Sequence, residues 1–258
     1  MKSISLYQDK KTPIHALDPL SKILYIIVAN IVPIIIGNHE ATAFFILLSI
    51  VLLSVGGVLK KTMPMLAFCG LILITVVIIQ GIFRQNNITP LFMIGPIIFY
   101  KEGLLFSLNI ILNVLNILMS FSILVLVTKP SDMVEAFVRL GLSPKIGYVL
   151  SSVFQIIPQM TETMSTITDA QRSRGMEMDG KILTRIKAFF PLISPVIMSS
   201  LISTRERAIA LEVRGFDSKQ KKTFLSDIKT THADITFKVI LLLILVLSII
   251  WRGIIWLR

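Results

Sequence analysis

The sequence is poor in the residues that build disulfides, metal centres and polar active sites. Cys69 is its only cysteine and lies in an apolar run, which excludes a disulfide within one chain. The three histidines, His15, His39 and His232, are scattered through polar segments, so we predict no metal site and no catalytic residue. No cleavable signal peptide is evident in the polar, lysine-containing amino-terminal segment, so we expect the first apolar run to act as an uncleaved anchor.

Acidic residues and histidine are missing from the long apolar stretches. Of the 258 residues, 54% are apolar, and the mean hydropathy of +0.80 excludes an ordinary soluble domain, whose surface would aggregate. Five runs span or nearly span a bilayer without any acid or histidine, and the first is short. They are Ile23–Ile36, Ala41–Leu59, Leu66–Phe83, Leu104–Val127 and Phe237–Trp256. The predicted fold class is all-α, a polytopic membrane protein with about five transmembrane helices and long cytoplasmic helices.

The basic residues are unevenly distributed. The net charge is +11, and more than half of the 26 lysines and arginines lie between Lys129 and Asp234. The positive-inside rule predicts that this segment and the amino terminus are cytoplasmic. It also makes Arg84–Gly103 an external loop, with turn signals at Asn86-Asn87 and Gly95-Pro96. We expect a membrane domain of four spans at residues 1–128, a cytoplasmic helical domain at 129–235 and a last span at 236–258.

Two stretches of the cytoplasmic segment are apolar, Ile146–Pro158 and Ala188–Ile202. Both are short for a span, and both contain proline. We interpret them as the apolar halves of two long helices that lie under or along the membrane. The alternative is two further spans, which would preserve the topology elsewhere.

Each of these two helices is predicted to end in an arginine-glycine cassette. The first cassette is Ala170–Gly175, and the second is Ala210–Gly215. A glycine after the last helical turn is the commonest helix cap, and an arginine there suits the helix dipole. One such end would indicate a capped helix and no more. Two in one chain favour a partner with two equivalent sockets, because arginine can grip carboxylate or backbone oxygens with several donors.

Other motifs are weaker. Gly175–Ile182 nearly matches a phosphate-binding P-loop, but Ile182 replaces the Ser or Thr that would hold magnesium, and Glu177 and Asp179 would repel phosphate. We therefore expect that this chain does not bind ATP itself. Glu135-Ala136 with Gly141 is weakly similar to a loop of ordinary ABC permeases, and we prefer to interpret the segment as an amphipathic helix that ends at Gly141. The basic charge lacks an aromatic-rich patch or zinc-spaced ligands, so no nucleic acid is expected.

Three asparagines, Asn109, Asn113 and Asn116, fall at helical spacing on one face of the fourth run. Amides in a membrane usually join helices by hydrogen bonds. We expect that role, with a substrate path as the alternative.

These segments together resemble the transmembrane T component of energy-coupling factor (ECF) transporters. Leu17–Lys22 is similar to the family's Leu-Asp-Pro-Arg-x-Lys, with leucine in place of the arginine. Lys101–Leu104 resembles its Glu-Gly-Leu, and Thr128–Pro130 its Thr-x-Pro. The two cassettes resemble its Ala-Arg-Gly signatures, although they read Ser-Arg-Gly and Val-Arg-Gly here.

The resemblance implies a non-catalytic coupling subunit of a prokaryotic multi-pass importer for a vitamin or a metal ion such as cobalt or nickel. Its partners would be two ABC ATPase subunits, which bind ATP and magnesium, a small membrane S component that captures the substrate, and the lipid bilayer. This chain would bind no cofactor. The implied ATPase contacts are Ser173, Arg174, Gly175, Val213, Arg214 and Gly215, supported by Arg172, Glu212 and Phe216. The implied seat of the S component is Phe154, Ile157, Pro158, Phe190 and Ile193, and the two long helices are expected to cross.

Two other functions compete with this one. An intramembrane enzyme would need acids, histidines or metal ligands near the interface, and the spans lack acid and histidine. Broken polar spans and inverted repeats would favour an ordinary permease or a secondary transporter that works without an S component, and we see neither.

Overall fold

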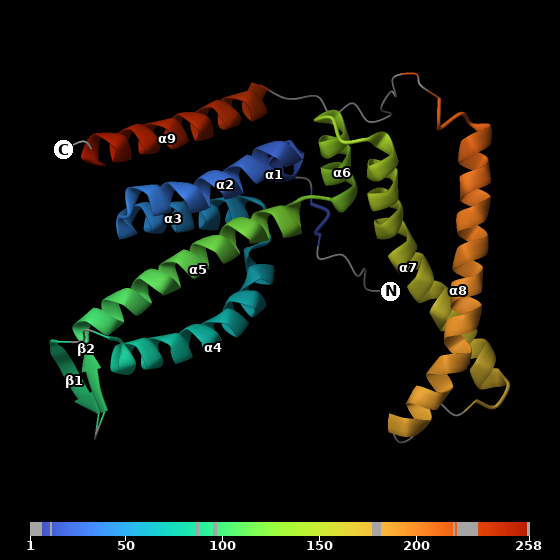
Figure 1. Cartoon of the computed structure of the whole chain (residues 1–258), viewed down its shortest axis with the longest axis horizontal. Helices are drawn as coiled ribbons and strands as arrows, with labels where there is room; N and C mark the ends of the chain where they lie inside the picture. Colours follow the sequence, from blue (N-terminus) through green and yellow to red (C-terminus); the bar gives the residue numbers. More distant parts are fainter. Residues whose placement is uncertain are drawn as a thin grey trace. The chain divides into compact units, whose positions relative to one another are not determined.

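The structure, a computed structural model, describes residues 7–256 except residues 11, 86–87, 95–96, 177–181, 219 and 221–231. For residues 92, 94, 97, 182–189 and 256 it describes the backbone alone. The described part is all-α, as predicted, apart from one β-hairpin (Figure 1). It forms two compact units, and the boundary between them falls within α6 (Pro130–Arg139). The first unit contains α1 (Pro13–Ala16), α2 (Pro19–Ile36), α3 (His39–Val55), α4 (Leu59–Phe83), β1 (Pro90–Ile94), β2 (Ile97–Tyr100), α5 (Lys101–Val127) and α9 (His232–Trp256). The second contains α7 (Pro144–Ser173) and α8 (Ile182–Val213).

Four of the described helices, α2, α4, α5 and α9, are long and apolar enough to cross a membrane. The first predicted run was expected to be short, but α2 begins at Pro19 and has 18 residues. The earlier start follows from Asp18, whose Oδ1 accepts a hydrogen bond from the Leu20 amide at 3.4 Å, and from the proline in the first turn.

The second predicted run, Ala41–Leu59, is not one helix. The shorter apolar helix α3 ends at Val55, and Leu59 already belongs to α4. Gly57 has a φ of 65°, and the Val58 amide donates to the Leu53 carbonyl at 3.0 Å. This bond closes a glycine cap, which stops the helix.

The segment predicted as an external loop contains an antiparallel hairpin, β1 with β2. Its apolar, partly β-branched and aromatic residues favour strands. Glu102 at the start of α5 holds the preceding loop, because its Oε1 accepts a hydrogen bond from Thr89 Oγ1 at 2.5 Å. The two predicted turn signals of this loop, residues 86–87 and 95–96, lie outside the described residues.

Gly103 allows α4 and α5 to approach closely. A Cβ atom at this position would lie 2.2 Å from the Gln80 carbonyl oxygen and 2.9 Å from the Gly81 Cα. Backbone atoms cannot yield as a flexible side chain can, so only glycine fits here.

The core of the first unit forms around α2, which packs against α3, α5 and α9. Tyr25, Val28 and Val32 of α2 are almost fully buried there, with Phe45 and Ile123 from the neighbouring helices. Polar side chains add hydrogen bonds between the helices. Asn116 Nδ2 donates to the Ala29 carbonyl at 2.6 Å, so the predicted helix-joining role is confirmed for this asparagine. Asn113 instead bonds to Asn109 within α5.

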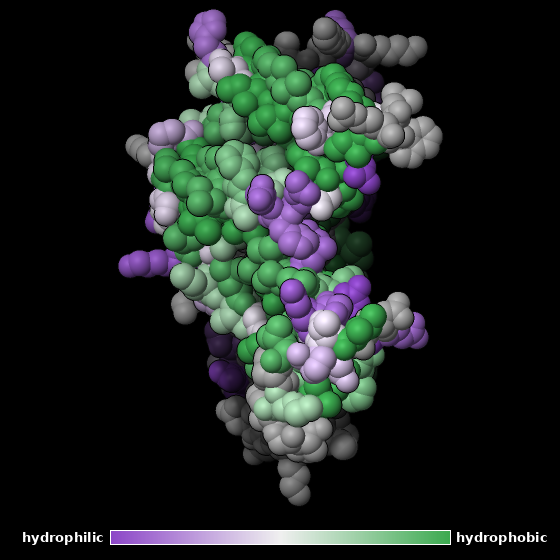
Figure 2. All heavy atoms as spheres, turned by 90° about the vertical axis from the view of Figure 1, so that its left-hand side faces the viewer, coloured by the Kyte–Doolittle hydropathy of each residue, from purple (hydrophilic) through white to green (hydrophobic). Residues whose placement is uncertain are grey.

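The outside of this unit is apolar. Large hydrophobic side chains are exposed along α4 and α9, for example Phe68 and Ile74 on α4 and Leu243 and Ile250 on α9. Figure 2 looks at the unit from the end where the hairpin lies, and hydrophobic surface dominates that view. Such a surface suits a lipid environment rather than water.

A charged cluster joins the starts of α2 and α9. Lys238 Nζ lies 2.5 Å from Asp18 Oδ2, and the Asp18 amide donates to Asp234 Oδ1 at 2.9 Å. Asp18 and Asp234 are 6% and 2% exposed. Asp18 and Lys238, which are 220 residues apart in the sequence, therefore neutralise each other's charge and hold the starts of α2 and α9 together.

In the second unit, both predicted apolar stretches are continuous with longer helices. The helix α7 has 30 residues and runs through Pro158, and α8 has 32 residues and runs through Pro191 and Pro195. Neither is among the four helices that are long and apolar enough to cross a membrane.

Candidate functional site

The two cassettes form the same cap at the ends of α7 and α8. At the first, the Gly175 amide donates to Arg172 O at 2.9 Å and the Met176 amide to Gln171 O at 3.1 Å. At the second, the Gly215 amide donates to Glu212 O at 2.9 Å and the Phe216 amide to Leu211 O at 3.0 Å. Both glycines have positive φ, 86° and 70°. This pair of bonds is the Schellman motif, so the predicted caps are confirmed at both ends.

The arginines distinguish these two caps from others in the chain. The ends of α3 and α6 show the same pair of bonds at Gly57 and Gly141, but the residue before the glycine is Gly56 or Leu140. A glycine cap alone therefore carries no functional meaning here. The feature that distinguishes the ends of α7 and α8 is the arginine directly before the cap glycine.

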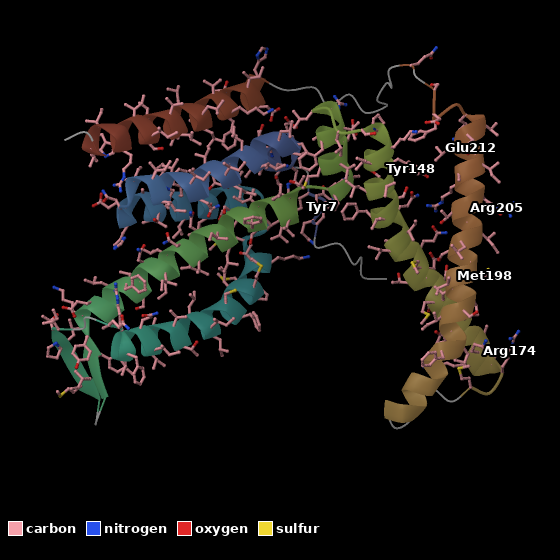
Figure 3. The ribbon with its side chains drawn as sticks, in the orientation of Figure 1. Tyr7, Tyr148, Arg174, Met198, Arg205 and Glu212 are labelled. Carbon is pink, nitrogen blue, oxygen red and sulfur yellow. The ribbon has the colours of Figure 1, made fainter. Side chains whose placement is uncertain are left out.

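Both arginine side chains are free within the described structure. Arg174 and Arg214 are exposed, and no hydrogen bond or ion pair joins either side chain to another described residue. Figure 3 shows Arg174 at the end of α7, directed away from the helix. The adjacent Arg172, Ser173, Glu212 and Val213 are exposed as well, Val213 by 83%. A multi-donor cation held on a rigid helix end suits recognition of an acceptor on another molecule.

Phe216 has a structural role that the sequence did not indicate. Its ring lies against that of Tyr148 on α7, with centroids 5.4 Å apart, and the neighbouring Asp217 Oδ1 lies 2.5 Å from Lys145 Nζ. These contacts fix the Arg214 end of α8 to the start of α7. Met176 occupies the equivalent position in the first cap and is half-buried.

The helices α7 and α8 cross, as the resemblance implied, and they run antiparallel to each other (Figure 1). Arg207 Nη2 on α8 donates to Gln159 Oε1 on α7 at 2.6 Å. Small hydroxyl side chains line a narrow gap beside this bond, and they are Thr163, Ser199, Ser200, Ser203 and Thr204.

The antiparallel crossing separates the two cassettes. Because Phe216 lies beside Tyr148, the Arg214 cap is at the start of α7, whereas Arg174 is at its end. At a rise of 1.5 Å per residue, helix geometry puts the two arginines roughly 40 Å apart. They cannot form one binding site and can only reach two.

The residues predicted to seat an S component lie on both helices. Phe154, Ile157 and Pro158 are exposed on α7, Phe190 is 70% exposed on α8, and Ile193 is partly buried. Leu192 and Val196 face inward instead. The seat was predicted to include the whole of both apolar stretches, Ile146–Pro158 and Ala188–Ile202, and their other exposed residues at helical spacing complete an apolar stripe along each helix. The additional members are Ile146, Val149 and Val153 on α7 and Ile197, Met198, Leu201 and Ile202 on α8.

Their spacing of three or four residues, visible in the sequence, indicates which residues of the two stretches share one helix face. The near match to a P-loop falls mostly on residues 177–181, which lie outside the described part. Within the described part, no group of three or more His, Cys, Asp or Glu side chains could hold a metal ion.

Comparison with known proteins assigns the family. The cobalt transport protein family, CbiQ, matches residues 10–224. The energy-coupling factor transporter transmembrane protein EcfT of Lactococcus lactis subsp. cremoris is 29% identical over 255 residues, 92% of this chain and 93% of that protein. EcfT of Streptococcus equi subsp. equi is 31% identical over 231 residues, 83% and 84% of the two chains. EcfT of Staphylococcus aureus is 36% identical over 138 residues, 50% and 51% of the two chains. The chain therefore belongs to the cobalt transport protein (CbiQ) family, together with these transmembrane proteins of energy-coupling factor transporters.

Proposed function

We propose that this chain is the coupling subunit of an ECF transporter in a bacterial cell membrane. It links two ABC ATPase subunits to an S component that captures a vitamin or a metal ion. ATP and magnesium bind to the ATPases, so this chain is not itself an enzyme and binds no cofactor. The family and the apolar helices support its membership of such a complex.

The observation that carries the proposal is the pair of identical arginine caps at opposite ends of the α7–α8 crossing. Each arginine is exposed and unpartnered among the described residues, and the two are too far apart to serve one socket. Two ATPase subunits offer two equivalent sockets. Ser173 and Val213, with Gly175 and Gly215, shape the ends that enter them.

The apolar stripe supplies the second interface. Its side chains are exposed on α7 and α8, and no other described residues cover them. An exposed apolar patch of this kind marks a protein or lipid contact. A small membrane protein such as the S component fits it by chemistry. Movement of the ATPases would then reach the S component through the crossed helices.

The test uses two reciprocal sets of variants of the whole complex. Arg174→Ala and Arg214→Ala should each weaken ATPase recovery, because truncating one partner of a buried charge pair costs roughly 2–5 kcal/mol. The double change should abolish ATP-driven uptake, and lysine should rescue poorly because it lacks the planar fork. Phe154→Asp should instead release the S component and leave the ATPases bound. Co-purification and uptake are measured for each variant.

Arg205→Ala is the matched control, because Arg205 is also exposed on α8 and has no partner among the described residues (Figure 3). It should recover ATPases as the wild type does. Normal ATPase recovery by the double arginine variant would refute the docking role and leave the caps with structural roles only.

We further propose that α7, α8 and the amino terminus are cytoplasmic and the hairpin is external, because the basic residues are concentrated between residues 129 and 234. In a Cys69→Ser background, Ile88→Cys and Ser165→Cys place single thiols at two exposed positions. An impermeant thiol reagent added to intact cells should label the first and not the second. The reverse pattern would invert the proposed orientation.

A further inference from the structure

A cavity of about 160 Å³ lies in the first unit, where α1, the start of α2, the end of α5 and the start of α6 meet. Two sequence segments that the coupling function leaves without a role, Leu17–Lys22 and Thr128–Pro130, come together around it. One water needs roughly 10–15 Å³ of such space, so the cavity is large enough for a small chemical group. It is distinct from the arginine caps and from the apolar stripe.

Lys22 supplies a buried positive charge to this cavity. The residue is 3% exposed, and its Nζ donates to the carbonyl oxygens of His15 and Val127, both at 3.4 Å. Bonds of that length are weak. A lysine ammonium has three donors, and the described residues provide no third acceptor. A buried charge with so few partners calls for a counter-charge or a strong acceptor.

Thr128 adds a second unsatisfied donor. The residue is 5% exposed and lines the same cavity, yet its Oγ1 has no hydrogen-bond partner among the described residues. Buried hydroxyl groups are almost always bonded. Lys22 and Thr128 therefore present an ammonium and a hydroxyl to one space.

The other charged groups around the cavity leave this donor pair available. Lys129 lies at the rim, where it forms an ion pair with Asp9 at 3.9 Å and lies over the Tyr7 ring. Asp132 is the one acid in the described lining, where it accepts a bond from Ser131 and its negative charge acts on Lys22 from outside hydrogen-bonding distance. The more distant Asp18 and Asp234, which also act on Lys22, are engaged with Lys238 and the Asp18 amide.

His15 forms part of the cavity wall and adds no positive charge to it. Its Nε2 donates to the Gln8 carbonyl at 2.8 Å, and its Nδ1 lies 2.7 Å from Thr12 Oγ1. Burial lowers the pKa of this imidazole, which favours the neutral ring. The Tyr7 ring closes the same side, beside the end of α5 (Figure 3).

We propose that this cavity binds the phosphate group of an anionic phospholipid, with Lys22, Thr128 and Lys129 as its donors. The cavity lies at the ends of two apolar helices, which is the depth at which phospholipid head groups occur. Ala16, Leu17, Pro19 and Val127 form an apolar part of the lining, suited to the glycerol and ester atoms next to the phosphate. The inference does not depend on the proposed coupling function.

The experiment uses the full chain in detergent, stripped of lipid and titrated with phosphatidylglycerol, phosphatidylcholine or inorganic phosphate. Native mass spectrometry counts bound lipid, and the unfolding midpoint reports stabilisation. Wild type should retain one phosphatidylglycerol in preference to phosphatidylcholine. Lys22→Met should weaken retention by about tenfold or more, because a charged bond is lost, and Thr128→Val by about threefold to tenfold.

Lys129→Gln is a third variant whose half-exposed site tolerates substitution, and it should weaken retention severalfold. The matched control is Lys61→Met, an exposed lysine of α4 away from the cavity, which should bind as wild type does. Stabilisation by inorganic phosphate without lipid retention would overturn the lipid assignment. Equal retention by Thr128→Val, Lys129→Gln and the control would overturn the site and leave a cavity that holds only water.

Discussion

The two compact units are stabilised in opposite ways. The first has a buried core around α2, with polar bonds between helices and an ion pair at the α2–α9 junction. In the second, α7 buries one residue in 30, Gly147, and the described side chains of α8 that are buried are Leu192 and Val196. A change in the crossing angle of these two helices would therefore break few buried contacts.

This difference shows where the chain relies on itself and where it relies on others. The first unit encloses its polar groups and exposes apolar surface suited to lipid. The second leaves arginines and apolar residues exposed, and an exposed apolar patch of this kind marks a contact with a protein or a membrane. Mutations in the first unit should therefore change stability, whereas mutations at the ends of α7 and α8 should change assembly.

The largest stability loss is expected from Gly103→Ala. The new Cβ would clash with backbone atoms of α4, and overpacking of this severity costs about 3 kcal/mol or more. Gly70→Ala is the control, because a Cβ there meets nothing within 4 Å and alanine favours a helix. Unfolding midpoints in detergent compare the two. Equal midpoints would show that α4 and α5 can separate without loss.

A smaller loss, about 2–3 kcal/mol, is expected when Lys238→Met leaves the Asp18 carboxylate buried without its partner. Asp18→Asn alone should also destabilise the protein. The double variant should lose less than the sum of the two single losses, since the pair acts as a unit. Additive losses in this double-mutant cycle would mean that the ion pair contributes nothing specific to the α2–α9 junction.

The smallest effect concerns pH. Burial, the largest cause, lowers the pKa of His15 below its ordinary value of 6.5, so the folded state disfavours the protonated ring. Stability from this group is complete above pH 6.5 and decreases as the pH falls below that value, because the unfolded chain binds the proton more readily. Unfolding midpoints at pH 8 and pH 5 should differ more for wild type than for His15→Gln. An identical difference would exclude His15 as a contributor.

The regular helices were predictable because their signals are local. The periodic apolar runs, the continuation of α7 and α8 through their prolines and the glycine caps at Gly175 and Gly215 all depend on neighbouring residues. The break at Gly56-Gly57 was also readable in principle, but the apolar residues on both sides concealed it. The hairpin after α4 was missed because its loop was read for turn signals alone.

The rest depends on packing between residues far apart in the sequence. Lys22 and Val127 are 105 positions apart, and no local pattern shows that their segments enclose a cavity. The stacking of Phe216 on Tyr148 was likewise invisible, because it requires that α8 return antiparallel to α7. Sequence reasoning found the two arginines but could not tell that the fold holds them at opposite ends.

The antiparallel crossing of α7 and α8 also has a consequence for symmetry. Two helices of similar length, each ending in the same cap, run antiparallel, so their capped ends lie at opposite ends of the pair. A single chain thus presents a pseudo-symmetric pair of ends. A two-fold symmetric dimer, the commonest protein assembly, could engage both ends with the same surface on each of its subunits. If such a dimer closed along its axis, it would displace the capped ends of α7 and α8 by equal amounts. The two helices would then move together.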